Sequence, residues 1–210
     1  MMRIVIADDH AIVRHGLRQI VEDEQDMCVV GEAGNGEELV ALLRQQPCDI
    51  VVLDVSMPGA SGLDVLKWIK ADHPRLPVLI LSIHPEDQYA VRVLRSGAAG
   101  YMTKDSAPEE LVKALRKVSH GGRYVSEAFA EKLLLELDSD GEKKVHDTLS
   151  DREYQVMCSI ARGRSVAQIA EELSLSVKTI STYRTRILEK TKLRSNADII
   201  HYAIQNNLLS

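Results

Sequence analysis

Short runs of apolar, often β-branched residues alternate with stretches of helical spacing along roughly the first 120 residues. The runs cover residues 3–7, 27–33, 48–54, 77–82 and 99–104. Between them, apolar residues recur every three or four positions, as at Val13, Leu17 and Ile20, which is the period of one helix face. Five repeats of this kind predict an α/β fold, with a doubly wound, five-stranded parallel sheet and helices on both of its faces.

Residues 149–210 lack strand-like runs and carry the start signals of helices instead. Ser150 with Glu153 and Ser165 with Gln168 have the spacing of capping boxes, and Ser176 and Ser195 can cap two further helices. This part is predicted to be a small all-α domain of four helices. Before it, we expect a helix after Ser126 and a flexible linker over the polar stretch 138–148. The predicted domains are therefore residues 1–122 and 149–210, joined by 123–148.

Composition bounds the class of protein without deciding its function. Apolar residues make up 45% of the chain, but no apolar run is long enough to span a bilayer and no signal-peptide pattern precedes the first strand. We therefore expect a cytoplasmic protein that makes no membrane contact. The three cysteines form no CxxC pair, which favours reduced thiols over a disulfide or zinc framework.

Charge is distributed unevenly along the chain. The net charge is −5, yet residues 149–210 hold nine Lys/Arg against six Asp/Glu. An acidic N-terminal part and a mildly basic C-terminal part indicate two different functions. Ordinary variation of surface charge produces a balance of this size as well, so the asymmetry alone does not decide the function.

Chemically active side chains follow the ends of several predicted strands. Asp8 and Asp9 follow the first strand, Asp54 ends the third, Ser82 ends the fourth and Lys104 follows the fifth. The carboxyl ends of parallel strands meet at one sheet edge, where neighbouring carboxylates repel one another. A Mg²⁺ ion removes that repulsion, and Lys104 with Ser82 is then available for an incoming phosphoryl group. Asp54 can attack phosphorus as a carboxylate and form an acyl phosphate.

Each of these residues has a plainer interpretation when it is taken alone. Paired acids after a strand often mark a helix N-terminus, so Asp9 could be an N-cap. A lone lysine such as Lys104 is usually solvated, and Tyr101 alone is more typical of a core residue. Only the combination of these residues favours a phosphoryl site.

The same residues belong to motifs that resemble those of response-regulator receiver domains. The motifs are "ADDH" (7–10), "LDVSMPGASGLD" (53–64), "LS" (81–82) and "AAGYMTK" (98–104), in order over residues 3–120. The resemblance implies a CheY-like, or flavodoxin-like, fold. It also implies that Asp54 is phosphorylated and that Lys104 binds the phosphoryl group, with Ser82 and Tyr101 as the switch pair.

The resemblance further implies a set of Mg²⁺ ligands. Asp9 and Asp54 would bind the ion directly, Asp8 mostly through water, and Ser56 through its backbone carbonyl. Two departures from the family pattern stand out: Asp105 replaces the proline that often follows the lysine, and Ser82 replaces the commoner threonine. Ser56 and His84 would flank the acyl phosphate and tune its hydrolysis.

The helical tail divides into two faces along residues 177–188. Val177, Ile180, Tyr183, Ile187 and Leu188 are expected on the face held by the domain core. The opposite face is polar, as a helix that reads base edges requires. Between Lys178 and Arg194 there are six basic residues and one acid, which forms a modest stripe for phosphate contacts.

The order of these segments resembles the LuxR-type helix-turn-helix. "VAQIAEELSLSVKTI" matches its central helix, turn and recognition helix, and the resemblance covers residues 149–210. It implies that Ser181, Thr182 and Thr185 face the major groove. Backbone contacts would come from Lys178, Thr179, Tyr183, Arg184 and Arg186. The last helix carries Ile199, Ile200 and Ala203, for which core packing and pairing of two copies on DNA are both open.

The two resemblances together match the NarL/FixJ family of response regulators, with the GacA/UvrY subgroup as a finer match. They imply a transcription regulator, not an enzyme, that receives phosphoryl from a sensor histidine kinase or a small acyl phosphate. Phosphorylation would release the recognition helix from the receiver and favour dimers on promoter DNA.

Two other functions account for parts of the same pattern. An aspartate-based phosphatase usually has a second acid two residues after its nucleophile, where this chain has Ser56. A DNA-binding protein whose receiver is only a passive dimerisation module would not need the complete set of acids, hydroxyl and lysine.

Overall fold

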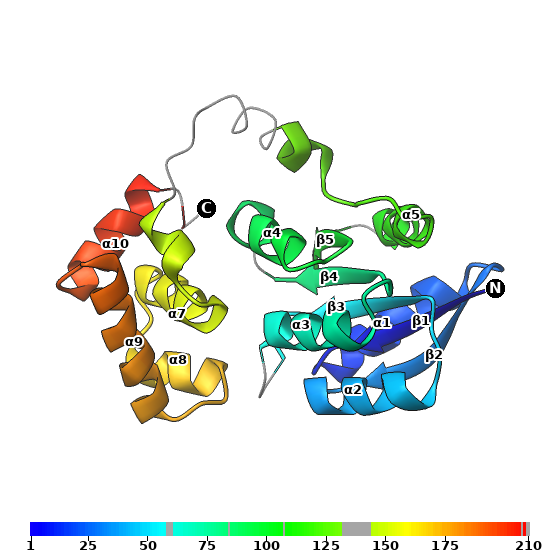
Figure 1. Ribbon diagram of the computed structural model, residues 1–210, viewed down its shortest axis with the longest axis horizontal. Coiled ribbons are helices and arrows are strands. Elements are labelled where there is room, and N and C mark those ends of the chain that lie inside the picture. Colours follow the sequence, from blue (N-terminus) through cyan, green and yellow to red (C-terminus); the bar gives the residue numbers. More distant parts are fainter. Residues whose placement is uncertain (58–60, 84, 107, 132–143, 207, 209–210) are drawn as a thin grey trace. The chain divides into compact units, whose positions relative to one another are not determined.

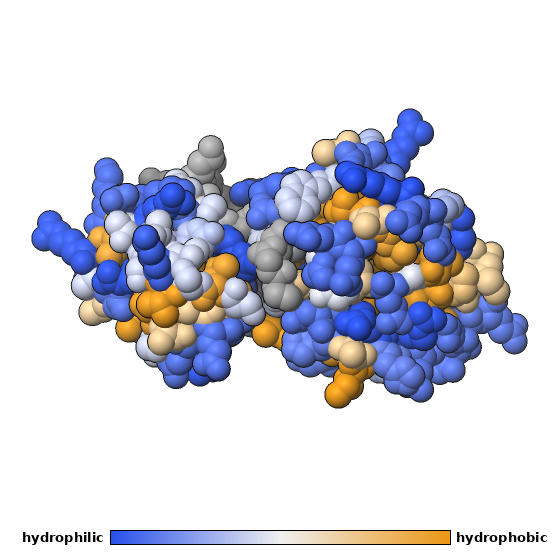
Figure 2. Space-filling view, turned by 90° about the horizontal axis from the view of Figure 1, so that it is seen from below, coloured by the Kyte–Doolittle hydropathy of each residue, from blue (hydrophilic) through white to orange (hydrophobic). Residues whose placement is uncertain are grey.

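We describe the protein from a computed structural model (Figure 1), which covers residues 1–57, 61–83, 85–106, 108–131, 144–206 and 208. Contacts divide the chain into two compact units, Met1–Leu135 and Glu136–Ser210. Among the helices of the described residues, none combines the length and the apolar character needed to cross a membrane. The face seen in Figure 2 is largely hydrophilic, with scattered hydrophobic patches.

The first unit is the predicted α/β fold. Its elements are β1 (Met2–Ala7), α1 (Ala11–Glu22), β2 (Met27–Ala33), α2 (Gly36–Gln45), β3 (Ile50–Asp54), α3 (Gly62–Asp72), β4 (Val78–Ser82), α4 (Glu86–Arg95), β5 (Gly100–Thr103) and α5 (Pro108–Ser119). The strands pair in parallel in the order β2-β1-β3-β4-β5. The predicted doubly wound, five-stranded parallel sheet is confirmed.

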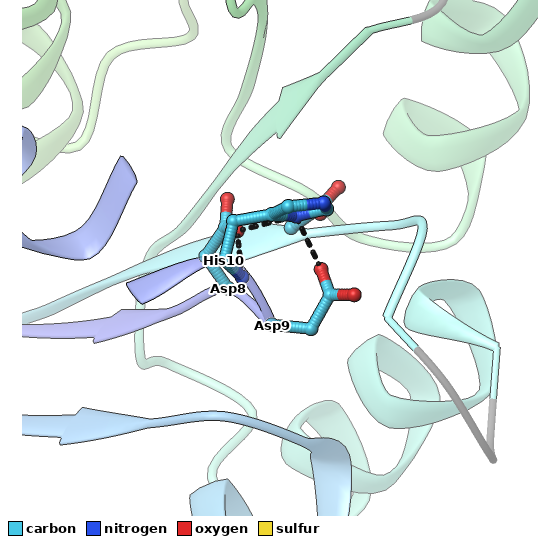
Figure 3. Close-up of side chains that lie close together, drawn as sticks. Asp8, Asp9 and His10 are labelled. Carbon is cyan, nitrogen blue, oxygen red and sulfur yellow. Dashed lines mark hydrogen bonds and ion pairs between the residues drawn. The ribbon is translucent and has the colours of Figure 1, made fainter. Parts of the chain in front are cut away.

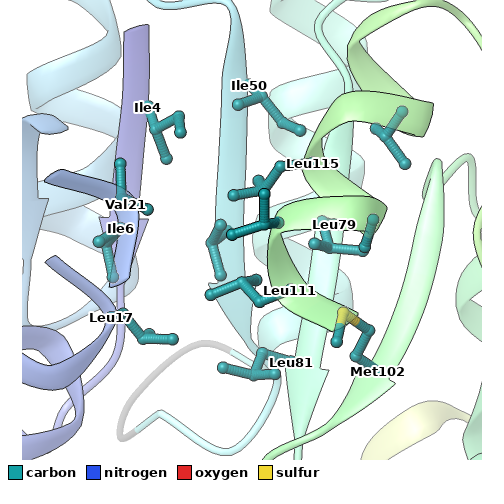
Figure 4. Close-up of a cluster of buried hydrophobic side chains, with 14 of the residues drawn as sticks. Ile4, Ile6, Leu17, Val21, Ile50, Leu79, Leu81, Met102, Leu111 and Leu115 are labelled. Atoms are coloured by element: carbon teal, nitrogen blue, oxygen red, sulfur yellow. The ribbon is translucent and has the colours of Figure 1, made fainter. Parts of the chain in front are cut away.

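The sheet is buried because helices cover both of its faces. On one face, α1 and α5 pack Leu17, Val21, Leu111 and Leu115 against the strands, as Figure 4 shows. Buried side chains of α2, α3 and α4 pack against the other face. Every residue of β3 and β4 is buried, which explains why these strands read as continuous apolar runs rather than alternating ones.

The strand order makes the carboxyl ends of β1 and β3 the topological switch point of the sheet. The chain turns to opposite sides of the sheet after these two strands, so their carboxyl ends open onto the point where ligands bind in folds of this kind. Register Ala7↔Leu53 sets the residues that follow β1 beside the last residue of β3. The fold therefore brings the acids after β1 next to Asp54.

The second unit is helical, as predicted. It contains a short 3-10 helix, η1 (Val145–Thr148), and the α-helices α7 (Asp151–Ala161), α8 (Val166–Glu172), α9 (Val177–Thr191) and α10 (Asn196–Gln205). Both predicted capping boxes are formed, at Ser150 and Ser165, and Ser176 and Ser195 cap α9 and α10. Gly163 has a φ of +81°, which suits the turn between α7 and α8.

The predicted linker is wrong at its C-terminal end. Its residues 145–148 form η1, and His146 there is buried, with its Nδ1 3.0 Å from the hydroxyl of Tyr202 on α10. The polar composition of this stretch did not indicate that His146 would be buried against a helix more than fifty residues away in the sequence. Residues 138–143 of the predicted linker lie outside the described residues, and so do 132–137 of the predicted helix, whereas 127–131 are helical.

Candidate metal centre and nucleic-acid interface

Three acids meet at the carboxyl edge of the sheet, as the sequence predicted. Asp8 and Asp54 are each only 1% exposed, whereas Asp9 is exposed. A ligand atom from each of Asp8, Asp9, Asp54 and His10 lies within 4.8 Å of the others. Burial of two carboxylates this close together is unfavourable without a compensating cation.

Lys104 supplies that compensation in this structure. Its Nζ lies 2.6 Å from Asp8 Oδ2 and 2.8 Å from Asp54 Oδ2, and its side chain is 14% exposed. The sequence predicted a lysine left available for an anion, but here the ammonium bridges the two buried acids. Any anion that uses Lys104 must therefore compete with both carboxylates.

The pKa shifts reflect this balance between burial and pairing. Burial raises the pKa of Asp54, and the hydrogen bond and charge of Lys104 only partly oppose it. Burial by itself lowers the pKa of Lys104, but its close contacts with the carboxylates of Asp54 and Asp8 outweigh burial, so the lysine pKa is raised. The ammonium is therefore fully charged at neutral pH, and the cluster holds it strongly.

The alternative role for Asp9, as a helix cap, is wrong. The N-cap of α1 is His10, and no side chain caps the helix. His10 instead joins the acids: its backbone N–H donates to Asp8 Oδ1 at 2.8 Å, and its Nδ1 lies 2.8 Å from Asp9 Oδ1 (Figure 3). His10 was not among the site residues predicted from the sequence. Its place directly after two acids at a strand end was the available signal.

The donor set fits a hard cation such as Mg²⁺. Asp8 Oδ2 is buried and, apart from its ionic contact with Lys104, has no hydrogen-bond partner among the described residues. Carboxylate oxygens that are close together, one of them lacking a hydrogen bond, match the oxygen ligands that Mg²⁺ prefers. The backbone N–H of Ser56 donates to Asp54 Oδ1 at 2.9 Å, which fixes this carboxylate, and the Ser56 hydroxyl oxygen is buried without a described partner.

The proposed switch residues lie on β4, the neighbour of the strand that carries Asp54, and on β5 at the edge beyond it. Ser82 ends β4 and Tyr101 lies in β5, and both are fully buried. The register pairs Ser82 with Thr103. Because Tyr101 is two residues before Thr103, and side chains alternate along a strand, the side chains of Ser82 and Tyr101 lie on the same side of the sheet. Lys104 N–H donates to the Ser82 carbonyl at 2.7 Å, which ties the lysine to the end of β4. His84 lies outside the described residues.

Helix α9 has the polar face that the sequence predicted. Lys178, Ser181, Thr182, Thr185 and Arg186 are exposed, whereas Ile180 and Ile187 are fully buried. Thr179, Tyr183 and Arg184 are partly buried, and Arg184 Nε donates to Asn196 Oδ1 at 2.6 Å. The hydroxyls of Ser181, Thr182 and Thr185 donate to carbonyls one turn back, so their oxygens face solvent mainly as acceptors.

One residue of the predicted core face is misplaced. Val177 is 54% exposed, because it is the first residue of α9 and lies beyond the reach of the helices that cover Ile180. Ile199 and Ala203 of α10 are fully buried, so core packing holds for them. The α9 helix is fixed to α7 by Lys190, whose Nζ lies 2.6 Å from Glu153 Oε2.

Comparison with known protein families matches both units. The family described as "Response regulator receiver domain" matches residues 4–116, and "Bacterial regulatory proteins, luxR family" matches residues 147–203. Response regulator UvrY of Escherichia coli K12 is 36% identical over 209 residues, covering 99% of this chain and 96% of the relative. Response regulator GacA of Pseudomonas aeruginosa is also 36% identical, covering 100% of this chain and 98% of the relative.

Solved structures of similar proteins cover both units as well. A structure of RcsB from Salmonella enterica serovar Typhimurium, bound to the promoter rprA in the presence of phosphomimetic BeF₃⁻, has a TM-score of 0.65. Its sequence is 28% identical, and the match covers 96% of this chain and 97% of that one. A structure of an RcsB–DNA complex has a TM-score of 0.61 and 30% identity, covering 96% of each chain.

Proposed function

We propose, since this chain belongs to the LuxR family of two-component response regulators, that phosphorylation of Asp54 controls how its helical unit binds promoter DNA. The observation that carries the proposal is the buried cluster of Asp8, Asp54 and Lys104 at the carboxyl edge of the sheet. Residues 1–122 serve as the receiver and residues 149–210 as the DNA-binding domain.

The chemistry at Asp54 is a phosphoryl transfer. A carboxylate oxygen of Asp54 forms a bond to phosphorus while the bond from phosphorus to the donor breaks, which leaves an acyl phosphate. The donor is a phosphohistidine of a sensor kinase or a small acyl phosphate. Lys104 already contacts Asp54 Oδ2, so its ammonium has only to transfer its contact to a phosphoryl oxygen.

The acids around Asp54 would hold Mg²⁺. Asp9 and Asp54 would be direct ligands, Asp8 would bind mostly through water, and the backbone carbonyl of Ser56 would add another oxygen. When bound, the ion neutralises charge on the phosphoryl oxygens. The Ser56 N–H keeps Asp54 oriented, and Ser56 at this position replaces the second acid that an aspartate-based phosphatase would use. Single covalent phosphorylation, rather than turnover, is therefore the expected activity.

The change from the inactive to the active state then depends on contacts with the phosphoryl group that are more favourable in one state than in the other. Ser82 on β4 and Tyr101 on β5 move toward the new charge, because a ligand shifts a two-state equilibrium only by binding one state better. Phosphorylation relieves masking of the recognition helix α9 by the receiver, and two copies then bind paired half-sites. RcsB dimers bound to DNA are the known precedent among the similar structures.

Helix α9 is the element that contacts DNA. Ser181, Thr182 and Thr185 offer acceptor oxygens and methyl groups to base edges, which suits exocyclic amino groups and thymine methyls. Lys178, Thr179, Tyr183, Arg184 and Arg186 contact phosphates. A protein with these two partners, a sensor kinase and a promoter, acts in the cytoplasm.

The experiment is phosphorylation of the full-length protein with acetyl phosphate and Mg²⁺, followed by intact-mass measurement and DNA binding. The duplex is first selected by the wild type from a randomised library. We expect one phosphate to be added to the wild type and none to Asp54→Asn, with tighter DNA binding only in the former. Addition of phosphate to Asp54→Asn, or equal DNA affinity with and without phosphate, would overturn the proposal.

A further inference from the structure

The segment that follows α5 returns to the sheet and pairs with the outer edge of β5. The N–H of Tyr124 donates to the carbonyl of Ala99 at 3.0 Å, and the carbonyl of Tyr124 accepts from Tyr101 N–H at 2.9 Å. These bonds form a parallel bridge between Gly100 and Tyr124. Since β5 is the last strand in the sheet order, Tyr124 covers an edge that would otherwise be open in the described sheet.

Side chains of α4 and α5 hold the same segment. The Tyr124 hydroxyl donates to Glu110 Oε2, and Lys117 Nζ lies 5.9 Å from the centre of the tyrosine ring. The Ser126 N–H donates to Glu86 Oε1 at 2.8 Å. We call these contacts, together with the two backbone bonds to β5, the connector clamp. It joins the start of the connector, which is the segment 123–148 between the two predicted domains, to α4, β5 and α5.

Glycine at position 100 is required for this approach. A Cβ added there would lie 2.8 Å from the carbonyl oxygen of Tyr124 and 3.0 Å from its Cβ. The added Cβ would also lie 2.9 Å from Leu79 Cδ1, so a side chain at position 100 would displace Tyr124 from β5 and press on the Leu79 side chain as well. The backbone φ of Gly100 is not in the left-handed region, so close approach alone explains the glycine.

After the clamp, the chain leads directly into a helical stretch. The Ser126 hydroxyl accepts from Phe129 N–H at 3.2 Å and so caps residues 127–131. These residues continue along the chain toward the helix-turn-helix unit. The clamp therefore stands between the switch residue Tyr101 and the covalent connection to the DNA-binding unit.

We propose that Tyr124 is a positioning residue that transmits the state of the phosphorylation site to the connector, through its backbone bond to Tyr101. This inference rests on the proposed function. A shift of β5 at Tyr101 changes the hydrogen bonds that hold Tyr124, and hence the start of the connector. The β5 edge is thus the two-state element that both the phosphoryl group and the connector bias.

The test measures coupling in the full-length protein. DNA affinity is determined with and without BeF₃⁻ and Mg²⁺, using the duplex that the wild type selects from a randomised library. Allosteric coupling typically changes affinity by about 5- to 150-fold, so we expect a wild-type ratio in that range. Gly100→Ala should bring the ratio within about twofold of one, and Tyr124→Phe, which loses only the bond to Glu110, should lower it about two- to fivefold.

Gly16→Ala is the matched control, because a Cβ at Gly16 meets nothing within 4 Å. It should keep the wild-type ratio. Intact-mass measurement after acetyl phosphate treatment should show the same phosphate gain at Asp54 in all four proteins. Hydrogen exchange at the amides of Tyr124 and Tyr101 should change together when BeF₃⁻ binds the wild type, which a merely structural role does not require.

The outcomes separate this inference from the proposed function. A wild type that gains no phosphate, or whose DNA affinity ignores BeF₃⁻, overturns both. If the wild type shows coupling, and Tyr124→Phe and Gly100→Ala keep the wild-type ratio of DNA affinities with and without BeF₃⁻, only the role of the clamp is overturned. Gly100→Ala could also destabilise the first unit, which urea unfolding followed by Trp68 fluorescence would detect. In that case Tyr124→Phe and Glu86→Gln provide the test, and a wild-type affinity ratio in both variants rejects the proposal.

Discussion

Replacing Lys104 with methionine tests the charge balance on which the site depends. Methionine keeps most of the apolar stem but removes the ammonium that lies 2.6 Å from Asp8 and 2.8 Å from Asp54. The two carboxylates then remain buried, at 1% exposure each, without a cation. Removing one partner of a buried ion pair typically costs about 3–5 kcal/mol.

Proton uptake returns part of this cost. Without Lys104, the pKa of Asp54 rises further above the usual carboxyl range, and each tenfold gain in proton affinity corresponds to about 1.4 kcal/mol. We therefore expect the free energy of unfolding to fall by about 2–4 kcal/mol at pH 7.5 without metal. A carboxyl pKa raised by folding means that the native state binds more protons than the unfolded state. The variant should accordingly gain stability as the pH falls from 7.5 to 5.5.

Magnesium should also recover much of the loss, since a divalent ion replaces the missing ammonium. An ion present at a hundred times its dissociation constant adds about 2.7 kcal/mol to the stability of the state that binds it. The gain should be larger in Lys104→Met than in the wild type, where the ion competes with Lys104.

The measurement is urea unfolding followed by the fluorescence of Trp68, the single tryptophan, which lies on α3 in the first unit. Lys113→Met is the matched control, because that lysine pairs with Glu110 on the exposed surface of α5. It should unfold like the wild type. A loss in Lys104→Met that is the same at pH 5.5, at pH 7.5 and with Mg²⁺ would refute this account of the cluster.

Three further predictions concern both units. Glu153→Gln should lower the stability of the helical unit by about 1 kcal/mol at pH 7, because glutamine can keep the capping box but loses the ion pair with Lys190. Burial opposes but does not cancel the contacts that lower the pKa of Glu153, so wild-type stability is lost as the pH falls through that lowered pKa. Hydrogen exchange in α7 should show this acid loss in the wild type and not in the variant, and equal acid sensitivity would contradict it. Arg186→Ala should weaken binding to every duplex about equally and reduce the slope of log affinity against log salt by about one, measured by anisotropy; a change confined to one base pair would instead indicate base reading. Cys48→Ser should leave alkylation of the native protein by iodoacetamide at pH 8 unchanged, since burial raises the pKa of this thiol to about 11 and leaves it protonated; a clear drop in labelling would contradict that environment.

Much of this protein followed from local sequence. The apolar runs ending in Asp54 and Ser82 specified buried strands, because a parallel sheet covered on both faces demands continuous apolar residues. The serines at 150 and 165 fixed helix starts through contacts within four residues. These features were predictable because their causes lie within a single turn or strand.

Tertiary structure decided the features whose partners lie far away in the chain. Lys104 bridges Asp8 and Asp54 because the order of the strands brings three distant loops together. His146 is buried because Tyr202 meets it from another helix, although its neighbours read as linker. Tyr124 pairs with β5 only because Gly100 leaves room for it. Local propensity fixes what a segment can become, but long-range packing and charge balance determine which groups it meets.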